Sequence, residues 1–130
     1  MIVSKIITAA LAHAAEEPDK DILFRNIEIP LINLGISELT DAENAFRANK
    51  DFTRPLSEPW YVDRPEDDLP YDWHITTMLL PLWLCWKIFE SIDEPSRGEA
   101  YRVLYESKYN AVVPAVWDTS EAVRRCGDEA

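Results

Sequence analysis

The chain has 130 residues, 47% of them hydrophobic, and its 13 basic and 24 acidic residues give a net charge of −11. This length is typical of a single domain, 1–130, and the apolar content excludes a disordered acidic tail. A protein that holds nucleic acid by its phosphates needs the opposite charge, so direct DNA binding is not expected.

The first part of the chain predicts helices. Apolar residues in 2–15 recur at helical spacing, and Pro18 ends this segment because proline disfavours helix in the residue before it. A second apolar pattern runs from 22 to about 50, where Pro30 predicts a kink or a division into two shorter helices. We expect the charged residues of its second half to lie on the solvent side; they are Glu38, Glu43 and Arg47.

Segment 51–71 is rich in proline and acidic residues. Four prolines fall within sixteen positions, a density that excludes a helix. Residues 60–62, Trp-Tyr-Val, are typical of a short edge strand. Because a loop of this length is uncommon in a small domain and usually has a function, we expect it to contact a neighbouring protein.

Two more helices are predicted after the loop. Asp72 caps the first of these helices. Its apolar residues, over 75–89, lie on nearly all sides of the helix and therefore predict burial on most sides. Pro81 predicts a bend in it. This stretch of about 15 residues is shorter than the roughly 20 of a membrane span, so no membrane contact is expected. The last helix, about 96–112, carries a stripe of three tyrosines spaced four residues apart, Tyr101, Tyr105 and Tyr109. A C-terminal tail, 113–130, follows.

These segments predict an all-α fold. It is a small bundle of four to five helices with a long, proline-rich acidic loop and extended termini. The low glycine content, three residues, agrees with helices rather than a turn-rich sheet protein. The two cysteines, Cys85 and Cys126, form no disulfide framework, which indicates a reducing, intracellular compartment.

The sequence contains no familiar catalytic or metal-binding motif. It lacks a glycine-rich phosphate loop, a nucleophile elbow and a C-x-x-C pair. His13 and His74 have no second histidine at metal spacing, and the acidic run 66–68 lacks the alternating oxygen ligands of a calcium loop. We therefore expect no catalysis, no cofactor and no metal.

Bulky side chains outside the predicted helices are the candidate partner-binding residues. Apolar bulk in a proline-bounded segment often anchors an interface, although such a side chain also packs back onto its own subunit. A basic pair near the C-terminus belongs to the terminal segments expected to contact neighbours. The candidates are Trp60, Tyr61, Trp117, Arg124 and Arg125.

Four patterns occur in order between residues 34 and 115. They are Leu34-Gly35-Ile36-Ser37-Glu38-Leu39 with Asp41-Ala42-Glu43, then Asp67-Asp68-Leu69-Pro70-Tyr71, then Leu80-Pro81-Leu82, and finally the spaced aromatics from Ala100 to Tyr109. In this order they resemble the head–tail adaptor proteins, also called connector or neck proteins, of tailed bacteriophages. The resemblance covers about two-thirds of the chain and rests on fold-level patterns.

The resemblance implies a structural virion protein rather than an enzyme. Subunits of that family form a ring, commonly of about twelve copies, through head-to-tail contacts that close. The ring docks beneath the portal protein, binds a stopper or tail-completion protein below, and extends the channel through which DNA passes without specific binding. It implies a place at the head–tail junction of the virion, and in the host cytoplasm during assembly.

Two other classes of protein remain as alternatives. An acidic binding or inhibitor module, similar to a DNA mimic, would block a basic protein; it predicts a monomer or dimer with charges gathered on one face. A small enzyme with an acidic metal site predicts carboxylates that converge in a pocket.

Overall fold

The structure is a computed structural model that describes residues 1–14, 21–50, 54–91 and 95–114. Four α-helices and no strand occur in this part of the chain, so the predicted all-α bundle is confirmed. The elements are α1 (Val3–Ala14), α2 (Asp21–Ala48), the π-helical turn η2 (Ile75–Leu79), α3 (Leu80–Ser91) and α4 (Pro95–Val112).

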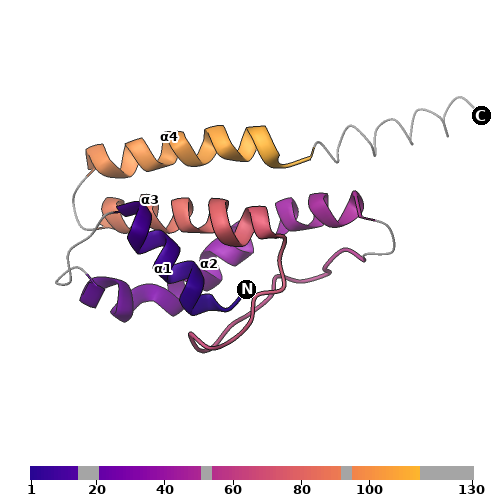
Figure 1. Ribbon diagram of the computed structural model, residues 1–130, viewed down its shortest axis with the longest axis horizontal. Helices are drawn as coiled ribbons and strands as arrows, with labels where there is room; N and C mark the ends of the chain where they lie inside the picture. The colour runs from indigo at the N-terminus through magenta and orange to yellow at the C-terminus, as the bar shows by residue number, and fades with distance from the viewer. Residues whose placement is uncertain (15–20, 51–53, 92–94, 115–130) are drawn as a thin grey trace, which may run out of the picture.

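Helix α3 is the centre of the bundle and contacts each of the other three helices (Figure 1). Its side chains are buried around most of the circumference, as the apolar pattern predicts. Pro81, at its second position, coincides with the change from π-helical to α-helical hydrogen bonding. The buried residues of α3 are Leu80, Pro81, Leu82, Trp83, Leu84, Cys85, Ile88 and Phe89.

Helix α2 is one continuous helix of 28 residues that includes Pro30. Of the two alternatives predicted at Pro30, the division into two shorter helices is therefore wrong. A proline inside a helix removes one backbone hydrogen bond, but packing holds the helix together on the C-terminal side of Pro30. There Ile32, Ile36 and Leu39 are fully buried at helical spacing.

Helix α4 forms the outer layer over α3 (Figure 1). The tyrosine stripe packs against α3 within the same chain: the ring centroids of Tyr105 and Trp86 are 5.8 Å apart, and those of Tyr101 and Phe89 are 5.4 Å apart. Gly98 is the buried residue of α4, and a Cβ atom added there would lie 3.2 Å from the backbone nitrogen of Glu90 in α3. The stripe therefore belongs largely to the fold of the subunit.

The loop after α2 caps the first turn of α1. The backbone N–H of Val3 donates to the carbonyl of Asp67 at 3.0 Å, and that of Ser4 donates to the carbonyl of Pro65 at 2.9 Å. These are N–H groups that have no partner inside a helix, so the loop satisfies them. The expected strand at 60–62 does not form, and the loop stays irregular where it is described.

No helix in the described part of the chain combines the length and the hydropathy that crossing a membrane requires.

A close crossing of α2 and α3 requires glycine at position 35. A Cβ atom added to Gly35 would lie 2.6 Å from Cδ1 of Leu80 and 2.8 Å from Cε3 of Trp83. Both neighbouring side chains are buried, so neither has free space into which it can turn.

Gly35→Ala is therefore expected to lower the free energy of unfolding by about 1 kcal/mol. Overpacking costs roughly 1–3 kcal/mol, and the higher helix propensity of alanine returns up to about 1 kcal/mol. Urea denaturation followed by circular dichroism at 222 nm measures this change. The matched control is Ser37→Ala, exposed on the same helix, which should leave stability unchanged or slightly higher. A Gly35→Ala chain as stable as the control would contradict the crossing.

Candidate interaction surface

One face of α2 holds the proline-rich loop through polar side chains. Asn33 donates from Nδ2 to the carbonyl of Val62 at 2.8 Å, and its Oδ1 accepts the N–H of Val62 at 2.9 Å. Asn44 pairs with Leu56 in the same two-way manner, at 3.1 and 2.7 Å. At 3.6 residues per turn, positions 33 and 44 lie within about 20° of each other around the helix. Each asparagine thus supplies the backbone hydrogen bonds that a neighbouring strand would otherwise supply.

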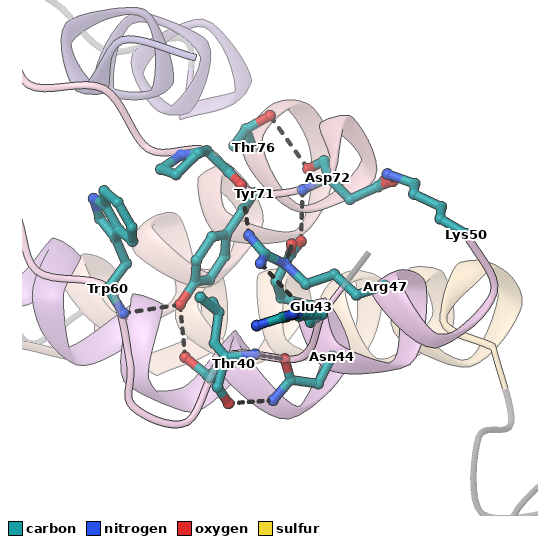
Figure 2. A network of polar contacts seen from close by, with 12 residues as sticks. Thr40, Glu43, Asn44, Arg47, Lys50, Trp60, Tyr71, Asp72 and Thr76 are labelled. Atoms are coloured by element: carbon teal, nitrogen blue, oxygen red, sulfur yellow. Dashed lines mark hydrogen bonds and ion pairs between the residues drawn. The ribbon is translucent and has the colours of Figure 1, made fainter. Parts of the chain in front are cut away.

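A chain of hydrogen bonds joins the middle of the loop to α2. The hydroxyl of Thr40 donates to the carbonyl of Ile36 at 2.7 Å and lies 2.8 Å from the hydroxyl of Tyr71. Because the proton of Thr40 is already used, Tyr71 donates to Thr40 and its oxygen accepts the backbone N–H of Trp60 at 3.1 Å. Figure 2 shows Tyr71 between the helix and the loop in this role.

Glu43 is buried at the base of the loop, with 2% of its surface exposed. One carboxylate oxygen accepts the N–H of Asp72 at 2.6 Å, and the other accepts Nε of Arg47 at 2.5 Å. Arg47 also donates to the carbonyls of Arg54 and Pro70, at 3.1 and 3.2 Å. The expectation that Glu43 and Arg47 face solvent is wrong, because the loop covers them. Their side chains form hydrogen bonds with the backbone near both ends of the described loop.

Asp72 begins the helical segment after the loop, as predicted. Its Oδ1 accepts the backbone N–H of His74 at 2.9 Å and lies 2.7 Å from Nδ1 of the same residue, and its Oδ2 pairs with Nζ of Lys50 at 2.8 Å. Burial raises the pKa of this carboxyl, but the hydrogen bonds from Lys50 and His74 outweigh it, so the pKa lies below its ordinary value. The carboxylate is ionised at neutral pH.

Two of the predicted partner-binding residues, Trp60 and Tyr61, lie in this hydrogen-bonded loop and are exposed to solvent. Trp60 is 42% exposed and Tyr61 is 69% exposed, while Val62 beside them is buried. They lie next to each other in the chain and form the aromatic surface of the loop. The other three predicted residues, Trp117, Arg124 and Arg125, lie outside the described residues.

Sequence reasoning missed a third exposed aromatic residue, Trp73, which is 60% exposed. Its ring stacks on that of His74, with centroids 4.0 Å apart, and His74 stacks in turn on Phe46 at 5.1 Å. The sequence did carry a signal for this exposure: Trp73 directly follows Asp72 and does not belong to the regularly spaced apolar residues of the helix that follows. This stack forms a separate aromatic surface beside the Asp72–Lys50 ion pair.

Among the residues that the structure describes, no group of three or more histidine, cysteine, aspartate or glutamate side chains is placed to hold a metal ion. The buried carboxylates of Glu43 and Asp72 are engaged by protein donors. What the described surface offers is exposed aromatic rings on a rigid support, which suits the binding of another macromolecule.

Comparisons with protein-family models, with curated proteins and with solved structures found no match to this chain.

Glu43→Ala is expected to lower the free energy of unfolding by about 2–3 kcal/mol. The substitution leaves the N–H of Asp72 and the guanidinium of Arg47 without their acceptor in a largely buried place. Urea denaturation at pH 7 measures the loss. Glu38→Ala, an exposed glutamate on the same helix, is the matched control and should change stability by less than about 0.5 kcal/mol. Equal stability of the two variants would show that the Glu43 network contributes nothing.

The lowered pKa of Asp72 predicts how stability depends on pH. A carboxyl whose folded pKa is below its ordinary value of 3.8 stabilises the fold above that value, and this contribution is lost as the pH falls through the folded pKa. The stability difference between the unsubstituted chain and Asp72→Asn should stay constant from neutral pH to about pH 5 and shrink below about pH 4. Urea midpoints across this range test it, with Asp41→Asn as the exposed control. A difference that persists unchanged to pH 2 would contradict the assignment.

Proposed function

We propose that this chain is a structural subunit of the head–tail junction of a tailed bacteriophage. In this proposal it is an adaptor that forms a ring beneath the portal protein, extends the DNA channel and receives a stopper or tail-completion protein. It carries out no catalysis and binds no cofactor. Its partners are further copies of itself and the two neighbouring components of the junction.

The observation that carries the proposal is the proline-rich loop, which is rigidly held and displays aromatic side chains. Trp60 and Tyr61 are exposed although the backbone at position 60 and the neighbouring Val62 are fixed by hydrogen bonds to Tyr71 and Asn33. A fixed loop loses little conformational entropy when it binds, and tryptophan and tyrosine are the residues that most often dominate interface energies. Such a loop is suited to permanent assembly.

Ring closure requires two different faces on each subunit. The aromatic surface of the loop supplies one. A second apolar surface lies on α4, where Val103 is 55% exposed and Leu104 is 42% exposed. Exposed apolar side chains at these two places on one chain support a head-to-tail contact.

The acidic balance of the chain supports a role next to moving DNA. A net charge of −11 repels phosphate, so a channel built from such subunits does not retain the genome during ejection. The same charge supports the second candidate, an acidic module that blocks a basic protein. That candidate predicts a soluble complex with a basic partner, whereas the adaptor is a permanent part of the particle.

Electron microscopy of particles from the virus that encodes this chain tests the adaptor function. An antibody raised against the purified chain should label the junction between head and tail. Trp60→Ala combined with Tyr61→Ala should reduce that label, and the yield of tailed particles, at least ten-fold, because both loop anchors are removed. The control is Trp73→Ala, which removes an exposed aromatic ring outside the loop.

A particle without label at the junction contradicts the adaptor proposal. Recovery of the chain from infected cells in a soluble complex with a basic protein would instead establish the inhibitor. Normal yield of tailed particles from the double variant, at normal stability of the variant chain, would remove the loop from the interface.

A further inference from the structure

A groove lies between α2 and α4 on the side of the bundle where both helices pack on η2. Its volume is about 380 Å³, so it has room for a long side chain. Figure 1 shows α4 as the outer helix, with the layer of α2 and α3 beneath it. The residues that line the groove are Glu38, Tyr105, Glu106, Tyr109 and Asn110.

The carboxylates of the groove come from both helices. Glu38 on α2 has no ion-pair partner among the described residues. The same holds for Asp41, which lies one turn further along α2 and is close enough to Tyr109 to raise the pKa of its hydroxyl. Glu106 on α4 pairs with Arg102 at 2.9 Å, but Arg102 also pairs with Glu99, so this triad keeps a net negative charge. The groove is therefore negatively charged, and basic residues of the described chain neutralise only part of this charge.

The remaining walls are aromatic. Tyr105 and Tyr109 are half-buried, their ring centroids are 5.9 Å apart, and their planes are inclined by 48°. Neither hydroxyl has a hydrogen-bond partner among the described residues. Burial raises the pKa of both tyrosines. Tyr109 and then the carboxylates of Glu38 and Glu106 raise that of Tyr105 further, and Asp41 raises that of Tyr109, so both phenols stay neutral.

These groups match the chemistry of a guanidinium ion. Carboxylates accept its fork of N–H donors in pairs, and aromatic faces attract its plane through cation–π contact. An ammonium group forms the same ion pairs but stacks less well on a ring, so arginine fits this groove better than lysine.

We propose that the groove between α2 and α4 binds an arginine side chain presented by a basic segment of a partner protein. The occupant is chosen by charge complementarity: an acidic groove with aromatic walls on a chain of net charge −11 selects a cation. The proposal does not depend on the adaptor function, since it concerns α2 and α4 rather than the loop.

Titration of the ¹⁵N-labelled full chain with a hexa-arginine peptide at physiological salt tests the proposal. The largest chemical-shift changes should occur at residues 38, 41, 105, 106 and 109. Hexa-citrulline, which has the same shape without the charge, should not bind. Hexa-lysine should bind at least three-fold more weakly than hexa-arginine.

Two triple variants separate the groove from the overall charge. Calorimetry should show that E38Q/D41N/E106Q binds hexa-arginine at least ten-fold more weakly than the unsubstituted chain. The matched variant removes the same charge from exposed loop positions, Glu58→Gln, Asp63→Asn and Glu66→Gln, and should lose less than three-fold. All six positions are exposed, so both chains are expected to fold, and circular dichroism checks this.

Equal losses in the two triple variants would overturn the proposal, because attraction to the net charge would then explain the binding. Shift changes centred away from the groove, or hexa-lysine binding as tight as hexa-arginine binding, would overturn it as well. Each of these results leaves the adaptor proposal untouched, since that proposal depends on particle labelling and on the loop residues.

Discussion

The carboxylate of Glu43 is the interaction on which the arrangement of loop and helices depends. It is almost completely buried, and a buried charge persists only where donors satisfy it. One oxygen accepts the N–H of Asp72, where the helical segment leading into α3 begins, and the other accepts Arg47, which reaches carbonyls at both ends of the described loop. A single side chain of α2 therefore sets the position of the loop and of the central helix relative to each other.

The consequence is a loop whose irregular backbone behaves as part of the scaffold. Asparagine side chains supply the hydrogen bonds that a neighbouring strand would otherwise supply, and the loop in turn caps α1. Exposed aromatic residues on such a support are arranged in advance for contact. The acidic groove between α2 and α4 is a second surface with different chemistry, so the same small bundle offers an apolar contact and a cation-selective one.

Most of the helical elements could be predicted from the sequence, because apolar spacing and proline positions are local signals. The limits of α1 and α4, the Asp72 cap and the burial of α3 follow from such signals. The predictions that failed needed knowledge of distant neighbours. Pro30 did not divide α2, and Glu43 was assigned to solvent although a loop that begins several residues later covers it.

Composition and periodicity by themselves determined that this chain is an acidic, all-helical protein with one long irregular loop, because burial of apolar residues at helical spacing needs no information from elsewhere in the chain. Only the tertiary structure decided which polar residues became structural. Asn33, Thr40 and Asn44 look like ordinary surface residues of a helix, but each has a hydrogen-bond partner that lies 12 to 31 positions further along the chain. A polar side chain has the same local pattern whether it faces water or a loop, and only packing distinguishes the two.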